Sequence, residues 1–228
     1  MVSGRDDRPY FFLSYARTPK RDPSDRDDPD RWVYRLYKDL CAEILQMTDA
    51  RPEEAGFMDR ENKIGTEWSP ELIANLTRCR VFVPLYSRRY FESDNCGREW
   101  FAFARREITR RARGGPVVDA IVPALWTRLN RERIPNVAQA VQFDHNVLGE
   151  RYCIEGFYGL MKLQNYRADY QRAVHRLARS YGNVEQRLAV PDIVELFRHD
   201  YEGTMLRDHF RLARVPAPAA REEAVGAL

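Results

Sequence analysis

Short apolar segments alternate with longer amphipathic segments along most of this chain. The first apolar segment, PYFFLSYA at 9–16, has the aromatic content of a buried strand, and a polar loop with three prolines follows it. Segment 30–47 then has the period of a helix, with Asp30 placed to cap it. Its apolar residues recur at helical spacing: Val33, Leu36, Leu40 and Ile44. Strands that alternate with helices predict a parallel sheet covered by helices on both faces.

The same alternation continues toward the C-terminus. Further short strands are predicted at 55–59, 80–87, 116–126 and 140–143, which makes five strands in all. One helix is predicted to begin at Ser69, a capping residue followed by proline, and another to end near residue 113 before two glycines. A long helix is predicted from about 157 to 181, on the apolar period of Tyr170, Val174, Leu177 and Tyr181. A small helix at 191–211 and a frayed tail complete the expected organisation.

Composition narrows the classes of function. No apolar run approaches the roughly 18 residues of a membrane span, and acidic residues stand near the start where a signal peptide would be basic, so we expect a cytoplasmic protein and no membrane. The four cysteines form no C-x-x-C pair and the four histidines have no metal-ligand spacing, so neither a disulfide framework nor a metal is expected. No P-loop, dinucleotide fingerprint or nucleophile elbow follows any strand.

Basic residues raise the question of nucleic acid. Of the 37 basic residues 33 are arginine, a bias that a GC-rich genome explains, and a cluster at 105–113 could bind phosphates. However, 34 acidic residues are interspersed, whereas nucleic-acid binders usually carry a stripe of one sign. Nucleic-acid binding is therefore the weaker alternative.

The stretch SDNCGREW, 93–100, carries an unusual glutamate. On a helix Glu99 shares a face with Asn95, Cys96, Ala102 and Phe103, so no basic residue stands three or four positions away. A solvated helix glutamate usually has such a partner. The absence indicates that Glu99 serves a ligand, although a solvated surface acid is the alternative.

Three motifs together resemble the TIR (Toll/interleukin-1 receptor) domain. YFFLSYA is similar to the family's first box, where a strand ends in a phenylalanine-x-serine-aromatic element. FMDRENKIGTEW resembles the second box with its BB loop, and YSRRYFESDNCGREW resembles the third element, which enters a helix and carries a glutamate. All three occur in the family's order and spacing.

The resemblance implies a fold and a domain organisation. It implies a flavodoxin-like, five-stranded parallel sheet with helices on both faces over residues 1–181, followed by a C-terminal helical extension at 182–228. The long last helix and the extension suggest a bacterial TIR-like protein of the FxsC type. Three departures stand out: Asn95 where many members have tryptophan, Ile64 in place of a proline, and Pro84 in an expected central strand, where we expect a bulge.

Many bacterial TIR domains cleave NAD+, so the resemblance implies an NAD+ glycohydrolase that uses NAD+ as substrate and needs no cofactor, in defence or signalling. It places the catalytic glutamate on Glu99. Nicotinamide leaves as a neutral ring, so the leaving group needs no proton, and one carboxylate can stabilise the oxocarbenium-like ribose. The product is left open between ADP-ribose and a cyclic isomer. The alternative is a non-catalytic adaptor module, which the loss of tryptophan at Asn95 favours.

The remaining candidate site residues each have a structural alternative. Phe12 and Ser14 belong to the nucleotide site or simply to the strand core and strand end. Tyr15 and Arg17 follow the strand, where Arg17 either contacts phosphate or is a solvated loop arginine. The resemblance also implies self-association through the BB loop.

Three more residues belong to the second and third motifs. Asp59 belongs to the substrate site or forms a turn after the second strand. Trp68 stacks on a base or anchors a helix start. Cys96 lies near the substrate, but we favour a packing role over a nucleophilic one.

Overall fold

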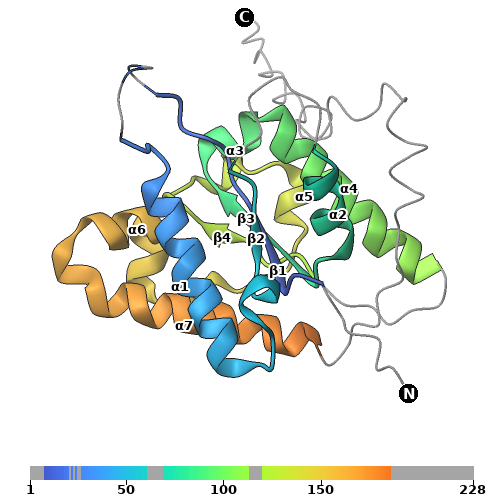
Figure 1. The fold of residues 1–228 in the computed structure, drawn as a ribbon. Coiled ribbons are helices and arrows are strands. Elements are labelled where there is room, and N and C mark those ends of the chain that lie inside the picture. The colour runs from blue at the N-terminus through green and yellow to red at the C-terminus, as the bar shows by residue number, and fades with distance from the viewer. Residues whose placement is uncertain are drawn as a thin grey trace, which may run out of the picture.

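The computed structural model describes residues 8–20, 22, 24, 27–60, 69–112 and 120–185. Its described strands are β1 (Phe11–Ser14), β2 (Phe57–Met58), β3 (Val81–Tyr86) and β4 (Ala124–Leu125). They form one parallel sheet in the order β2-β1-β3-β4. The chain is therefore an α/β protein with the expected parallel sheet, and the carboxyl ends of the strands meet at one edge, at the top of Figure 1.

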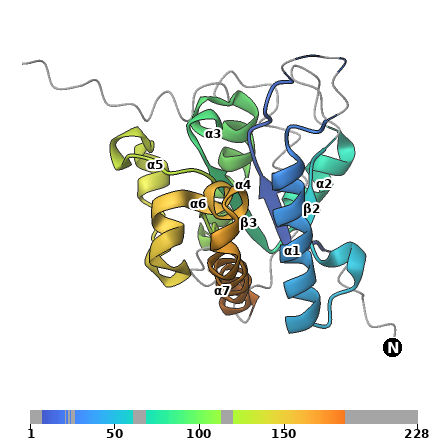
Figure 2. The same ribbon diagram turned by 90° about the vertical axis from the view of Figure 1, so that its left-hand side faces the viewer.

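Helices cover both faces of this sheet. One face carries α1 (Arg31–Met47), α6 (Glu150–Lys162) and α7 (Arg167–Glu185), which pack against one another and stand in front in Figure 2. The other face carries α2 (Pro70–Arg78) and α4 (Asp94–Ala112), which also pack together. Short helices complete the described chain: η1 (Pro52–Glu54), α3 (Arg88–Glu92), η2 (Arg131–Arg133), α5 (Asn136–Gln139), η3 (His145–Leu148) and η4 (Gln164–Tyr166). No helix among the described residues is both long and apolar enough to cross a membrane.

The buried face of each helix follows its sequence period. The four apolar residues predicted for α1 are its buried residues, and Ser69 caps α2 by accepting a hydrogen bond from the Leu72 N–H at 3.1 Å. Asp30 differs, because its carboxylate accepts a hydrogen bond from the Thr18 N–H at 3.1 Å and makes no side-chain cap on α1. The aspartate thus ties the loop after β1 to the start of α1.

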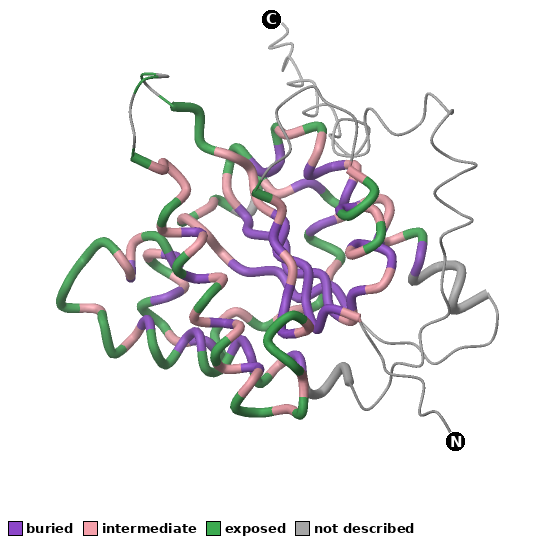
Figure 3. Tube along the Cα trace, viewed as in Figure 1, coloured by how far each residue is buried: buried purple, intermediate pink, exposed green. Residues whose placement is uncertain are grey.

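The core is continuous from the sheet into the helices. All residues of β1 and β3 are buried, and the strands form the purple centre of Figure 3. The ring centroid of Phe12 lies 5.4 Å from that of Phe57 and 5.9 Å from that of Phe82, so aromatic packing joins β2, β1 and β3. On the face covered by α1, α6 and α7, the ring centroid of Tyr181 in α7 lies 5.7 Å from that of Phe11.

The fourth strand is shorter than predicted, and the expected fifth strand is absent from the described residues. Residues 140–143 form no strand, because α5 and the turn after it occupy this part of the chain. The β3–β4 pairing is interrupted between the bridge Phe82↔Ile121 and the pair Leu85↔Ala124, where Pro84 and Pro123 stand. Proline has no N–H to give to a ladder, so pairing stops there.

The bulge expected at Pro84 is absent from the pairing of β3 with β1. The register with β1 runs without an extra residue from Phe11↔Val81 to Ser14↔Pro84. Phe82 donates its N–H to Ala120, on the β4 side, so the backbone nitrogen of Pro84, two residues on, faces the same side. The missing N–H is therefore lost from the β4 side and not from the pairing with β1.

The predicted long helix at 157–181 is two helices. α6 ends at Lys162, Leu163 is extended, and the turn η4 precedes α7. The predicted apolar period is correct within α7, where Tyr170, Val174, Leu177 and Tyr181 are buried. The break lets α7 fold back on α1, where the Tyr170 hydroxyl donates to Asp39 at 2.6 Å. The predicted helix at 191–211 and most of the extension lie outside the described residues.

Candidate functional site

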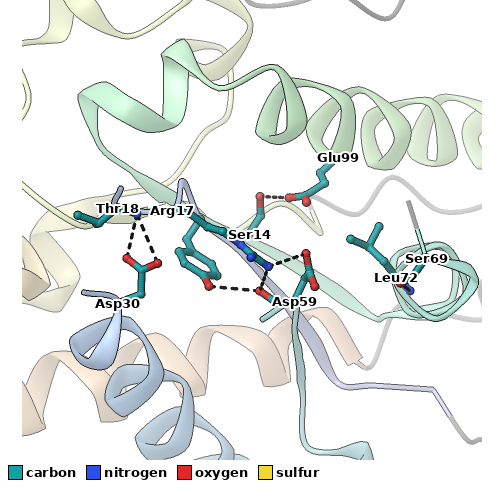
Figure 4. A network of polar contacts seen from close by, with 9 residues as sticks. Ser14, Arg17, Thr18, Asp30, Asp59, Ser69, Leu72 and Glu99 are labelled. Carbon is teal, nitrogen blue, oxygen red and sulfur yellow. Dashed lines mark hydrogen bonds and ion pairs between the residues drawn. The ribbon is translucent and has the colours of Figure 1, made fainter. Parts of the chain in front are cut away.

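Three of the predicted site residues meet at the carboxyl edge of the sheet. Ser14 is the last residue of β1, Asp59 directly follows β2, and Glu99 comes from the second turn of α4 (Figure 4). The segment 93–100 places Glu99 here because Ser93 begins the helix, with its hydroxyl accepting a hydrogen bond from the Cys96 N–H at 3.3 Å. The topology therefore brings together residues from three motifs.

Glu99 is buried and hydrogen-bonded. Its exposed fraction is 8%, and its Oε2 accepts a short hydrogen bond from the hydroxyl of Ser14, itself 1% exposed. The expectation that Glu99 has no partner is therefore wrong: a residue 85 positions away supplies a neutral one. The expected lack of a basic partner is confirmed within the described residues, where no arginine or lysine forms an ion pair with Glu99.

Burial dominates the electrostatics of Glu99. Loss of hydration raises its pKa to about 8, against the smaller lowering effect of the Ser14 hydrogen bond. The charge of Asp59 raises the pKa further, and that of Arg17 lowers it. The ligand-free site therefore holds a mostly neutral glutamic acid at pH 7.

A second polar cluster borders this carboxyl. Arg17 donates to the Asp59 carboxylate at 3.2 Å and to the Asp59 carbonyl at 3.4 Å, and the Tyr15 hydroxyl donates to the same carbonyl at 3.2 Å. The cluster ties the loop after β1 to the residue that precedes the loop 60–68. In this structure Arg17 and Tyr15 are thus bound to Asp59, and their predicted contacts with substrate stay predictions.

Phe12 and Cys96, two further predicted site residues, are both buried in the core. Phe12 is 1% exposed within the aromatic packing of the strands, and Cys96 is 2% exposed. Burial raises the pKa of the Cys96 thiol well above its usual range, and Glu99 raises it further, which leaves no reactive thiolate. Their predicted substrate contacts stay predictions. Trp68 lies outside the described residues, as does the rest of the loop 61–68.

Sequence reasoning missed Tyr90. This α3 residue is fully buried, and its hydroxyl lies 3.1 Å from Ser14 Oγ. A signal was available, since Tyr90 follows the capping residue Ser87 directly after β3 and hence at the same edge of the sheet. However, neither the helical period nor a motif predicts which aromatic residue of α3, Tyr90 or Phe91, contacts Ser14.

Two further observations bear on binding. A cavity of about 540 Å³ lies between α1, α6 and α7, lined by Trp32, Leu160 and Arg167 among others, and no predicted site residue lines it. We place the candidate site at the carboxyl edge nonetheless, because the buried acid lies there and the cavity is rimmed by exposed side chains. Among the described residues no group of His, Cys, Asp or Glu is arranged to hold a metal ion.

Comparison with known families identifies the chain. A family model for the TIR domain matches residues 11–150. The chain belongs to the TIR-domain family. No curated protein and no solved structure matches it. The TIR match spans all four strands and the motifs that contain Ser14, Asp59 and Glu99, and the FxsC type stays a prediction.

Proposed function

We propose that this TIR domain binds NAD+ and cleaves its nicotinamide–ribose bond, with Glu99 as the catalytic residue. The observation that carries the proposal is the buried Glu99 carboxyl, held by Ser14 at the carboxyl edge of the sheet. Ligands of open α/β sheets bind at this edge. TIR domains include both NAD+-cleaving enzymes and adaptors, so the activity itself must be tested.

The chemistry suits a single acid. The C1′–N1 bond breaks, its electron pair leaves with neutral nicotinamide, and positive charge develops on the ribose. Water then adds at C1′ and releases a proton, which gives ADP-ribose; attack by an adenine nitrogen would give a cyclic isomer instead. A carboxylate in a dry site stabilises that positive charge far better than one in water.

The neutral state of the ligand-free acid fits this role. A cationic nicotinamide ring beside Glu99 favours the charged form of the carboxyl, because opposite charges lower the pKa of an acid. Substrate would therefore ionise Glu99 on binding, and the burial that raises the pKa would then strengthen the attraction to the ribose. The aspartate and arginine of the neighbouring cluster lie close enough to influence Glu99 and are candidates for holding hydroxyl or phosphate groups.

The proposal is tested by incubating the pure protein with NAD+ and measuring nicotinamide by chromatography. We expect release by the wild type and none above background by Glu99→Ala. The matched control is Glu92→Ala, which removes an exposed glutamate that pairs with Arg88 on α3. Equal release by Glu99→Ala and wild type at unchanged Tm would show that Glu99 is not catalytic, and no release by any of the three proteins over a range of concentrations would reject the enzyme.

The second candidate function is a non-catalytic interaction module. The low exposure of Glu99 and the presence of Asn95 in place of tryptophan favour it, because a closed acid without a stacking surface could be purely structural. TIR domains commonly self-associate, and we extend the proposal to assembly through the loop 60–68. Sizing chromatography over a hundredfold dilution distinguishes the cases, because an interaction module forms larger species and releases no nicotinamide, whereas an assembly-dependent enzyme gains specific activity with concentration.

A further inference from the structure

Three buried groups form a hydrogen-bonded chain that crosses three elements. Tyr90 of α3 lies 3.1 Å from Ser14 of β1, and Ser14 donates to Glu99 of α4. Their exposed fractions are 0%, 1% and 8%. Residues this far from water are not held by solvent, so their mutual hydrogen bonds fix where each proton lies.

The direction of the protons follows from counting donors. When Glu99 is ionised it can only accept, so the single hydroxyl proton of Ser14 points to Glu99 and the Ser14 oxygen is left to accept a hydrogen bond from Tyr90. Burial raises the pKa of Tyr90 well above its usual range, and the charge of Glu99 raises it further. Tyr90 therefore keeps its proton near neutral pH and can donate it to Ser14 whenever Ser14 donates to Glu99.

We propose that Tyr90 is a positioning residue that holds the Ser14 hydroxyl on Glu99 and thereby favours the ionised form of this glutamate. A donor that itself accepts a hydrogen bond is more strongly polarised, so Ser14 binds a carboxylate better with Tyr90 behind it than without. Removal of the Tyr90 hydroxyl also frees the Ser14 hydroxyl to rotate away. Both effects disfavour the charged carboxyl and leave the neutral acid almost unchanged.

The other groups that face Glu99 do not supply this function. Cys96 on the same helix keeps its proton because it is buried, and its thiol is a further hydrogen-bond neighbour of Ser14, while Asp59 after β2 and Arg17 after β1 act through their charges in opposite directions. None of them is removed when Tyr90 or Ser14 is changed. A comparison of these variants with the wild type therefore isolates the hydroxyl chain.

The inference concerns the ligand-free protein, and only its meaning for activity rests on the proposed function. If Glu99 acts as a carboxylate on ribose, nicotinamide release needs its ionisation, and the acidic limb of the pH profile follows the titration of Glu99. Tyr90 would then set the lowest pH at which the site works. The titration can be measured whether or not the protein cleaves NAD+.

The experiment follows the carboxyl carbon of Glu99 by NMR as pH rises, in full-length protein with ¹³C-labelled glutamate and no NAD+. The resonance is assigned as the one missing from Glu99→Gln. We expect Tyr90→Phe to move the midpoint upward by about one pKa unit, a tenfold rise in proton affinity. The matched control is Tyr86→Phe, which removes the hydroxyl of a neighbouring buried tyrosine whose hydrogen bond goes to Ala138 at 3.4 Å. We expect this control to titrate as wild type.

Coupling between the variants decides the mechanism. We expect Ser14→Ala to raise the midpoint at least as much as Tyr90→Phe, and the double variant to add nothing, because Tyr90 acts through Ser14. A wild-type midpoint in folded Tyr90→Phe would overturn the proposal, as would an additive double variant. If Tyr90→Phe is too unstable to study, an unshifted midpoint in Ser14→Ala overturns it as well, since that change cuts the chain and leaves the Tyr90 ring in place.

Discussion

Replacement of Glu99 by glutamine should make the protein more stable at neutral and alkaline pH. The folded protein binds the Glu99 proton more tightly than the unfolded chain does, because burial raises the pKa from 4.5 to about 8. The contribution of Glu99 to the free energy of unfolding is therefore fully present below pH 4.5, and it is lost as the pH rises from 4.5 through about 8. Glutamine stays neutral throughout and can still accept a hydrogen bond from Ser14.

The size of the effect follows from the width of that window. Each pH unit between the two pKa values costs the wild type about 1.4 kcal/mol of unfolding free energy, so about 2.7 kcal/mol is lost between pH 5 and pH 7. For a chain of this length, that corresponds to a Tm difference of about 5–11 °C. Glu99→Gln should have nearly the wild-type Tm at pH 5 and exceed it by this amount at pH 7.

Thermal unfolding followed by circular dichroism from pH 5 to pH 9 measures the difference directly. Glu92→Gln is the control, because it removes an exposed carboxyl and should follow the wild type at every pH. Parallel curves for wild type and Glu99→Gln would refute the reasoning, since they would mean that Glu99 titrates alike in the folded and unfolded states. A variant that gains stability and loses nicotinamide release would show that the protein keeps a destabilising acid for its function.

Two further predictions concern Gly156 of α6 and His145 of η3. Gly156 has φ 66°, and a Cβ there would lie 2.7 Å from the Trp126 carbonyl oxygen, so Gly156→Ala should cost about 2 kcal/mol or more of stability in urea unfolding. Gly149→Ala is the control, because Gly149 has φ 123° in open space, and equal costs would mean that the close contact is unimportant. Burial lowers the pKa of His145 to about 4, so its contribution to stability is complete above pH 6.5 and is lost as pH falls toward 4. His145→Gln should therefore lose less Tm than the wild type between pH 7 and pH 4.5, and an equal loss in both proteins would contradict the burial of this imidazole.

Much of the fold could be predicted from local periods in the sequence. The apolar stripe of α1, the cap and proline that begin α2, and the first three strands lie close to where the sequence puts them. The order of these elements was enough to bring Ser14, Asp59 and Glu99 to one edge of the sheet, because parallel strands align their carboxyl ends.

The parts that failed depend on neighbours far away in the sequence. The segment 140–143 has the composition of a strand, but among the described residues it pairs with neither edge strand, β2 or β4. The turn between α6 and α7 is set by the docking of α7 on α1, which no local pattern encodes. In the site, the missing helical ion pair could be read from the sequence, but the hydroxyl partner of Glu99 comes from β1, and Tyr90 of α3 is hydrogen-bonded to that partner.

The helices α6 and α7 bear on where this domain ends as a foldable unit. The family match stops at residue 150, whereas Phe157, Leu160 and Tyr181 are buried, and Tyr181 packs on the first strand. A fragment cut at the end of the match would therefore leave the α1 face of the sheet partly uncovered and expose a wide apolar surface. The segment that matches the family is therefore shorter than the segment that packs as one core, and a transfer of the carboxyl edge of the sheet into another protein would have to include the chain at least to Tyr181.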